Sequence, residues 1–291
     1  MLLSSLGRPL PLPPPRLRFM GEDDRLLLEI GDGLAALLVE HGLTHDSTVL
    51  DVGCGYGRLA LGILHSTDYR GPYLRFDILA QHIAWCRETI TPLYPDLEFR
   101  HLDIRNERYN PGGTLDPTQA RFPAKSGGTD VCALFSVFTH LYRPVVERYL
   151  AEVHRVLRPG GVAVTTWLMF DEARLPAVTS EQAVYPMIHA LDEETRYASD
   201  DDPLRAIAFH EGLVRSMAAR ARLEVVVIER GTWAGEPSRL FQDLVVLRRS
   251  ASDDAIDPDR RSSRLRVADA ARRLIGRGVR CAPGLSRSPC R

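Results

Sequence analysis

The chain has 291 residues, enough for one large domain or two small ones. Hydrophobic residues at 44% and charged residues at 26% are typical of a soluble globular protein, and no run of about 18 apolar residues predicts a membrane-spanning helix. The formal net charge of −1 provides no general attraction to nucleic acids or anionic membranes, so neither is expected as a partner.

Proline-rich and arginine-rich segments flank the central part of the chain. Residues 1–20 form a proline-rich lead without the features of a cleavable signal peptide. Residues 251–291 hold ten Arg and five Asp, and we expect a flexible tail with one short helix near 265–276. The cysteines form no C-x-x-C pair, which predicts reduced thiols and a cytoplasmic protein. They are Cys54, Cys86, Cys132, Cys281 and Cys290.

Helices and strands are expected to alternate over residues 23–168. Apolar periodicity predicts helices over about 23–41, 57–65, 80–90 and 143–157. Short apolar runs predict strands over 48–52, 72–77, 97–102, 130–135 and 162–168. The glycine- and proline-rich residues 106–128 read as a loop. This alternation implies parallel strands joined by right-handed crossovers.

The segment after the fifth strand follows a different pattern. Residues 170–204 are expected to be irregular, and a helix over about 205–221 follows them. The β-rich runs 223–229 and 241–247 have a short link, which predicts an antiparallel hairpin. The predicted fold class is therefore α/β, with a seven-stranded, mostly parallel sheet that ends in a C-terminal hairpin within residues 21–250.

The most informative motif is the strand-to-helix turn within residues 49–60. Its glycines, which allow positive φ and close approach of a ligand to the backbone, are Gly53, Gly55 and Gly57. The helix that follows offers free N–H groups. A dinucleotide-binding turn would need a glycine where Arg58 stands, and a phosphate-binding P-loop would need a lysine, whereas the one lysine is Lys125. What is left is a G-x-G-x-G turn preceded by Asp51.

Acidic residues end the predicted strands, and ligands of open parallel sheets bind at those ends. Asp77 lies 20 residues after Gly57, a spacing that suits a carboxylate accepting hydrogen bonds from both hydroxyls of a ribose. The alternative is a solvent-exposed cap of the next helix. Asp103 ends the third strand, and it could equally be a loop residue. Asp51 is expected to order the glycine turn and to face a cationic group of the ligand.

The segment after the fourth strand carries Ser136 and His140. His140 has an ordinary pKa near neutrality, so it is either a general base for an incoming hydroxyl or amine, or a structural histidine bonded to the backbone. Tyr142 and Trp167 either shape a pocket or belong to the core. No metal-ligand motif is present, so we expect no catalytic metal.

Taken together, these motifs resemble the class I, Rossmann-like methyltransferases that use S-adenosylmethionine, and among them a branch that acts on small molecules. The likeness covers roughly residues 17–249. Beyond the glycine turn it rests on the segments 18–21, 77–86, 94–99, 108–113, 136–140, 155–161, 231–233 and 242–243. One departure is Arg75, which stands where the family tends to have glycine near the ribose.

The resemblance implies S-adenosylmethionine as the cofactor. The residues that would bind it are Asp51, Gly53, Gly55, Gly57, Asp77, Ile78, Asp103, Ile104 and Ser136. In the family, an acid at the position of Asp103 accepts from the adenine amino group, and a residue placed like Ile104 lies beside the ring.

The expected reaction is methyl transfer to an oxygen or nitrogen of a small, hydroxylated or sugar-like acceptor, with His140 as the candidate base. Residues 170–205 would form a lid over the acceptor. Their acidic patch either recognises the acceptor or is a solvated loop; its members are Asp192, Glu193, Glu194, Asp200, Asp201 and Asp202. Two alternatives are a non-catalytic protein that binds S-adenosylmethionine and an RNA methyltransferase that uses the tail 251–291.

Overall fold

The computed structural model describes residues 2–4, 6–19 and 23–251. The tail expected over 251–291, with its short helix near 265–276, lies outside the described residues except for Ala251. Within the described part, no helix is both long and apolar enough to cross a membrane. The described thiols of Cys54, Cys86 and Cys132 are all free, as expected.

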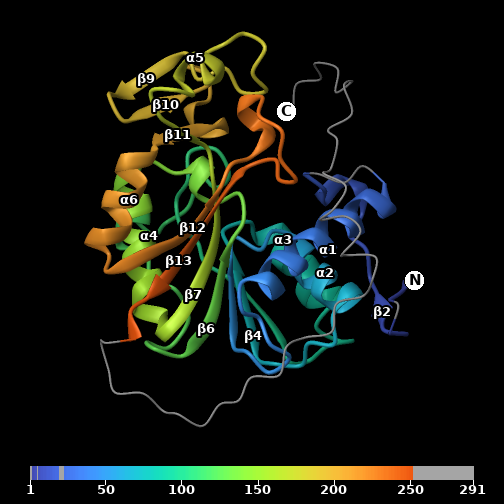
Figure 1. The fold of residues 1–291 in the computed structure, drawn as a ribbon. Coiled ribbons are helices and arrows are strands. Elements are labelled where there is room, and N and C mark those ends of the chain that lie inside the picture. Colours follow the sequence, from blue (N-terminus) through green and yellow to red (C-terminus); the bar gives the residue numbers. More distant parts are fainter. Residues whose placement is uncertain (1, 5, 20–22, 252–291) are drawn as a thin grey trace.

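A seven-stranded sheet lies at the centre of the structure (Figure 1), in the order β12-β13-β7-β6-β3-β4-β5. The strands are β3 (Val49–Val52), β4 (Tyr73–Asp77), β5 (Leu97–His101), β6 (Thr129–Leu134), β7 (Leu157–Trp167), β12 (Leu223–Glu229) and β13 (Asp243–Arg249). Strands β3 to β7 pair in parallel, whereas β13 runs antiparallel to both β7 and β12. The predicted parallel sheet with its C-terminal hairpin is confirmed.

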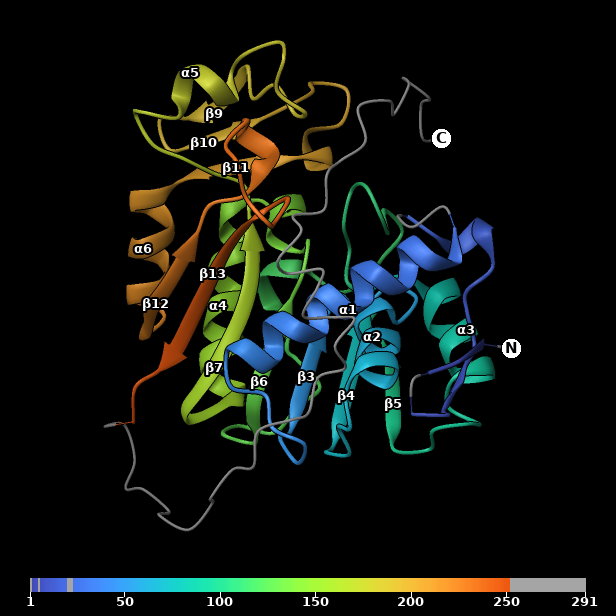
Figure 2. The ribbon, with the colours of Figure 1, turned by 45° about the vertical axis from the view of Figure 1, so that its right-hand side comes forward.

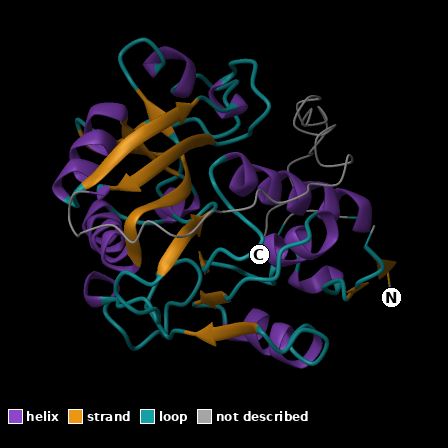
Figure 3. Ribbon diagram, turned by 60° about the horizontal axis from the view of Figure 1, so that its bottom comes forward, coloured by secondary structure: helices purple, strands orange, loops and turns teal. Residues whose placement is uncertain are grey.

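Helices cover both faces of this sheet (Figure 3). One face carries α1 (Asp24–Glu40), α2 (Arg58–Ser66) and α3 (Ala80–Thr89), and the other carries α4 (Arg143–Val156) and α6 (Glu211–Arg220). Successive side chains of a strand point to opposite faces, so each strand contributes to both layers. In β3, Leu50 and Val52 pack in the α4/α6 layer, and Val49 packs in the α1–α3 layer.

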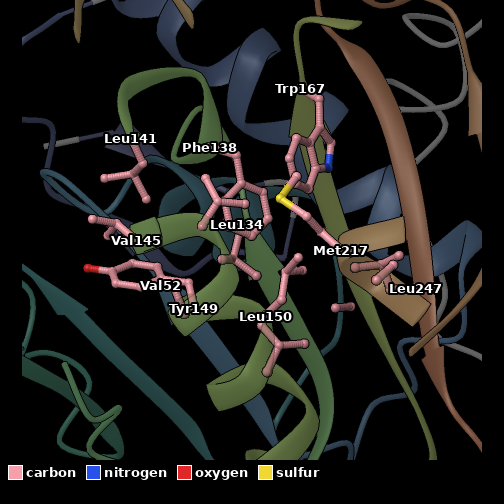
Figure 4. Packing of buried hydrophobic residues seen from close by; sticks show 14 of the residues in the cluster. Val52, Leu134, Phe138, Leu141, Val145, Tyr149, Leu150, Trp167, Met217 and Leu247 are labelled. Carbon is pink, nitrogen blue, oxygen red and sulfur yellow. The ribbon is translucent and has the colours of Figure 1, made fainter. Parts of the chain in front are cut away.

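The core of the α4/α6 layer is built around aromatic and branched side chains (Figure 4). Trp167 is fully buried and stacks on Phe138 with ring centroids 4.2 Å apart. Its indole N–H donates to the hydroxyl of Thr165 at 2.7 Å, so the buried polar group is satisfied. Of the two interpretations of Trp167, the structure supports the core residue.

Residues 170–204, expected to be irregular, instead contribute to a second sheet of four strands in the order β8-β11-β10-β9. The strands are β8 (Met169–Phe170), β9 (His189–Asp192), β10 (Thr195–Tyr197) and β11 (Ile207–His210). With the short helix α5 (Leu175–Val178), they lie beyond the end of β7 (Figure 2). We call residues 169–210 the lid.

The prediction of a helix over 205–221 was wrong for residues 205–210. Residues 203–205 form the 3-10 helix η4 (Pro203–Arg205), and 207–210 form β11, because Ile207, Ala208 and Phe209 are all buried between β8 and β10. Helix α6 begins only at Glu211, where the ring nitrogen Nδ1 of His210 accepts the Gly212 N–H at 3.1 Å as an N-cap. Helical periodicity continues across this junction in the sequence, so the pattern alone placed the start too early.

Three short elements lie near the N-terminus. Strands β1 (Leu2–Leu3) and β2 (Pro9–Leu10) form an antiparallel pair, and the 3-10 helix η1 (Pro15–Leu17) follows.

The start of β7 differs from the prediction. This strand begins at Leu157 rather than at the expected residue 162, and its pairing with β6 has an irregularity.

Helices α1 and α2 cross where each carries a glycine. A Cβ atom built on Gly62 would overlap the carbonyl group of Gly31, and one built on Gly31 would lie 2.9 Å from the Arg58 carbonyl oxygen. The two backbones can approach this closely only because both positions lack a side chain. This contact holds α2, and with it the glycine turn that precedes α2, against α1.

We therefore expect Gly62→Ala to lower the free energy of unfolding by about 1–3 kcal/mol or more, because the added methyl group forces α1 and α2 apart. Gly33→Ala is the matched control on α1, since nothing lies within 4 Å of the position that its methyl group would take. This control should be neutral or stabilising by about 0.5–1 kcal/mol. Urea unfolding of both variants provides the measurement, and similar values for the two would refute the close-packing interpretation.

Candidate functional site

The glycine turn connects β3 to α2 at the carboxyl edge of the sheet. Gly53, Gly55 and Gly57 have φ angles of 71°, 54° and 81°, in the left-handed region that favours glycine. A Cβ atom on Gly55 would meet nothing within 4 Å, so the turn is open there. Gly57 is closed from below, because a Cβ would lie 3.2 Å from Ile90 and 3.4 Å from Phe99. The backbone of the turn is therefore more accessible at Gly53 and Gly55 than at the buried Gly57.

Asp77 fastens this turn to the end of β4. Its Oδ2 accepts the Gly55 N–H at 2.6 Å, and its Oδ1 accepts the Leu79 N–H at 2.8 Å. The carboxyl is 6% exposed; burial raises its pKa, and the hydrogen bonds from Gly55 and Leu79 oppose that rise. The bond to Leu79, the N-cap residue of α3, agrees in part with the helix-end alternative.

Asp51 lies beneath the turn rather than at its rim. It is 3% exposed and accepts a hydrogen bond from the Tyr73 hydroxyl at 3.1 Å. Burial raises its pKa to about 7, and the positive charge of Arg75 is the largest opposing influence. The carboxyl therefore lies near its midpoint of ionisation at neutral pH.

Asp103 follows β5 and orders the loop after it. Its Oδ1 accepts from the Asn110 amide at 3.0 Å, and its Oδ2 accepts from the Thr114 hydroxyl at 2.8 Å and the Thr114 N–H at 3.1 Å. These bonds lower the pKa of Asp103, and the bond from Asn110 has the largest effect. Its neighbour Ile104 is buried and bridges to Leu115. Ile78, beside Asp77, is partly buried against the α4/α6 core.

Ser136, at the end of β6, has a strained backbone. Its φ of 58° is one of two positive values among the described non-glycine residues. The Ser136 N–H donates to the Thr166 hydroxyl at 2.7 Å, and its hydroxyl donates to Gln242 Oε1 at 3.0 Å. Such strain persists only where the surroundings enforce it, and it concentrates at functional sites. The pattern of the sequence did not assign Gln242 a place in this site; its contact spans 106 residues of chain.

His140 joins the sheet to the lid. It ends η3 (Phe138–His140), and its Nδ1 lies 2.8 Å from the Leu204 carbonyl oxygen of η4, which requires the proton on Nδ1. Burial lowers its pKa to about 4, so the imidazole is neutral at pH 7. The ring also meets Tyr109 edge-on, with centroids 5.3 Å apart. This geometry agrees with the structural histidine bonded to backbone.

Ion pairs between core and lid use part of the acidic patch. Asp202 pairs with Arg108, and Glu194 lies 3.6 Å from Arg143. Asp200 accepts from the Tyr197 hydroxyl at 2.6 Å within the lid. The patch is therefore neither a purely solvated loop nor a free acidic surface.

Asp243, at the start of β13, binds several parts of the lid and of the β12–β13 connection through its carboxylate. This fully buried carboxylate accepts the N–H groups of Met169 and Gly231 at 2.7 and 2.8 Å. It also accepts the indole N–H of Trp233 at 2.7 Å and a guanidinium N–H of Arg174 at 3.1 Å. One side chain thus joins the first lid strand, the residue that precedes α5 and the β12–β13 connection.

Side chains that could ligate a metal are not clustered in the part of the chain that the structure describes. No group of three or more His, Cys, Asp or Glu side chains there is placed to hold a metal ion. The positions of Asp51, the three turn glycines, Asp77 and Ser136 do meet at one edge of the sheet. Asp103 and Ile104 follow the neighbouring strand β5.

The central part of the chain is similar to a known protein family. Residues 49–161 match the family model described as a methyltransferase domain. This match runs from the first residue of β3, just before the glycine turn, to Gly161 in β7.

Several solved structures share the fold at low identity. The PH0226 protein from Pyrococcus horikoshii is 18% identical, with a TM-score of 0.53 over 81% of this chain and 96% of that one. A putative methyltransferase from Haloferax volcanii, solved with a methyltransferase activator, is 14% identical, with a TM-score of 0.52 over 78% and 93%. A putative sarcosine dimethylglycine methyltransferase from Galdieria sulphuraria is 14% identical, with a TM-score of 0.51 over 78% and 88%.

The buried Asp243 leads to a stability prediction. Asp243→Asn should lower the free energy of unfolding by about 3–5 kcal/mol, because the buried Arg174 would lose its one buried counterion and keep only the half-exposed Glu236. Glu236→Gln is the control: Glu236 also pairs with Arg174, at 2.8 Å, but its side chain is 42% exposed. Its loss should cost less than about 1 kcal/mol. Urea unfolding distinguishes the two, and an equally small effect of both would show that Asp243 does not anchor the lid.

Proposed function

We propose that the chain is a class I methyltransferase that uses S-adenosylmethionine and that it methylates an oxygen or nitrogen of a small, hydroxylated or sugar-like acceptor. The observation that carries the proposal is the open glycine turn. Its backbone is exposed at Gly53 and unobstructed at Gly55, and Asp51 and Asp77 lie next to it.

The residues present suit this cofactor. Positive φ at three glycines and free space above Gly55 leave room for a ligand against the main chain. When bound, S-adenosylmethionine supplies an electrophilic methyl group, so the difficult chemistry belongs to the cofactor. Asp51, Gly53, Gly55, Gly57, Asp77, Ile78, Asp103, Ile104 and Ser136 would bind it, as the resemblance implies.

The protein's own task is then to hold acceptor and cofactor in line, which can lower a barrier by about 7–11 kcal/mol. The lid supports this role, because its strands lie beyond the carboxyl end of β7 (Figure 2). Polar side chains meet where lid and core join: Arg108 pairs with the lid residue Asp202, and its chain neighbour Glu107 accepts from the Tyr142 hydroxyl within the core at 3.4 Å. Hydroxyl and carboxylate groups in such a border suit an acceptor with several hydroxyls.

Methyl transfer itself is tested by incubating the purified chain with S-adenosylmethionine and a panel of hydroxylated metabolites. A product heavier by about 14 mass units would support the proposal. Binding of the cofactor with no product from any acceptor would favour the non-catalytic alternative. Methylation of RNA that disappears when residues 251–291 are removed would favour the other alternative, an RNA methyltransferase that uses this tail.

Asp77→Ala should weaken binding of S-adenosylmethionine by about 1–3 kcal/mol, because it removes the proposed ribose acceptor and releases the Gly55 N–H. Asp116→Ala is a matched control. Asp116 is an exposed loop aspartate that accepts from Thr118, and its loss should leave the dissociation constant unchanged. Calorimetry measures both, and an unchanged constant for Asp77→Ala would remove Asp77 from the site.

For His140, we propose a positioning role through its bond to the Leu204 carbonyl. His140→Ala should lower turnover with cofactor affinity nearly intact, and His140→Asn should recover most of the turnover because its amide can donate to the same carbonyl. Since its pKa is about 4, the wild-type rate should show no step from His140 between about pH 5.5 and 8. A step near neutrality that both variants abolish would instead identify a general base.

A further inference from the structure

Arg75 is a fully buried arginine on β4, directly beneath the glycine turn. It pairs in register with Asp51 of β3 on one side and with Phe99 of β5 on the other. Its guanidinium carbon lies 3.6 Å from the centre of the Tyr73 ring and 4.4 Å from that of Phe99. The two rings therefore hold the charged group in place by cation–π contacts.

This guanidinium is poorly compensated by hydrogen bonds. None of its three nitrogens has a hydrogen-bond partner of acceptable geometry among the residues that the structure describes. Burying such a charge costs free energy unless an opposite charge lies near it, and an apolar side chain of similar size would avoid that cost. The retained charge therefore points to a role other than packing.

The groups that face Asp51 come from five elements. Tyr73, Arg75 and Asp77 belong to β4, Arg58 to α2, Cys86 to α3, Cys132 to β6 and Cys54 to the turn. Only Arg75 and Arg58 carry a positive charge, and Arg75 has the larger effect on Asp51. Tyr73 contacts both members of the pair, since its hydroxyl donates to Asp51 and its ring underlies Arg75.

We propose that Arg75 is a positioning residue that acts through Asp51: held between Tyr73 and Phe99, it is the counter-charge that favours the ionised form of Asp51 beneath the glycine turn. An ionised Asp51 offers a negative charge to the ammonium group at the amino-acid end of the cofactor. This role rests on the proposed binding of S-adenosylmethionine at the turn. It also gives a purpose to the arginine at a position where the family tends to have glycine.

Because the proposed binding of the cofactor depends on the charge of Asp51, the affinity for the cofactor should depend on pH. When Asp51 is protonated, the ligand loses its ionic partner, so affinity should fall as the pH drops below the midpoint of Asp51. Without Arg75 this midpoint should rise by about one pH unit or more, because an opposite charge nearby normally lowers it by that amount. The fall in affinity would then begin at a higher pH.

The first measurement needs no ligand. Carbon-13 NMR of the full chain, with labelled aspartate, follows the titration of the Asp51 carboxyl, assigned by its absence in Asp51→Asn. Arg75→Met removes the charge and fills the space, and Arg75→Lys keeps the charge. We expect the midpoint to rise in Arg75→Met and to stay near the wild-type value in Arg75→Lys. Arg75→Gln serves as the neutral variant if Arg75→Met does not fold.

The second measurement is calorimetry with S-adenosylhomocysteine between about pH 6 and 8.5. The ratio of variant to wild-type dissociation constants cancels titration of the ligand's own amino group. Arg75→Met should bind about fivefold more weakly than wild type at pH 7 and nearly equally well at about pH 8.5. In the double variant with Asp51→Asn, substitution of Arg75 should no longer change the pH profile.

The two measurements separate the proposals. An Asp51 midpoint that does not move in the neutral variants overturns the role of Arg75, whatever the ligand does. Absence of binding by wild type overturns cofactor binding at the turn, and the NMR titration still decides whether Arg75 sets the charge of Asp51. A uniform loss of affinity at every pH would show a packing role and would likewise overturn the counter-charge.

Discussion

The hydrogen bond from the Gly55 N–H to Asp77 is the interaction on which the site depends. This bond of 2.6 Å joins the turn after β3 to the end of β4. The other hydrogen bonds between the turn and β4 are donated by the Gly53 and Cys54 N–H groups to the Phe76 carbonyl oxygen. Three left-handed glycines have no intrinsic preference for one conformation. The turn is therefore ordered by its neighbours, and Asp77 is the neighbour with a charge.

The two faces of the sheet differ in a way that serves the turn. The α4/α6 face is apolar, with Val52, Phe76 and Leu134 in one packed layer. The α1–α3 face carries Asp51 and Arg75 among apolar side chains, with Asp77 at the strand end. Strand alternation forces this division, since residues 51, 75 and 77 all point to the side where α2 begins. The apolar face stabilises the sheet, and the opposite face places charge under the edge where we propose that the ligand binds.

Much of the fold followed from local patterns in the sequence. The parallel strands, their crossover helices and the C-terminal hairpin were predicted because each leaves a periodic apolar trace over a short stretch of chain. The glycine turn was predictable because positive φ at Gly53, Gly55 and Gly57 restricts the residue type. Asp77 and Asp103 were found at strand ends, but their partners Gly55 and Thr114 could not be derived from spacing alone. A lid was expected over residues 170–205, but its four-stranded sheet was not predicted, because the pairing comes from distant residues. Strands β8 and β10 are only two and three residues long, and β11 is buried between them by contacts that the chain order hides. The role of Asp243 was equally hidden, since Met169 lies 74 residues away from it in sequence.

The residues at the entry to β13 connect the lid to the proposed cofactor edge of the sheet. Asp243 holds the lid through Met169 and Arg174, and Gln242 accepts the hydroxyl of the strained Ser136. Gln242 lies in the bend just before β13 and Asp243 is the first residue of the strand, so one dipeptide makes both contacts. A movement of the lid that displaces Asp243 must therefore shift Gln242, and with it the side chain that restrains Ser136. The β12–β13 hairpin is in this way a mechanical link between the proposed acceptor side and the proposed cofactor side of the site.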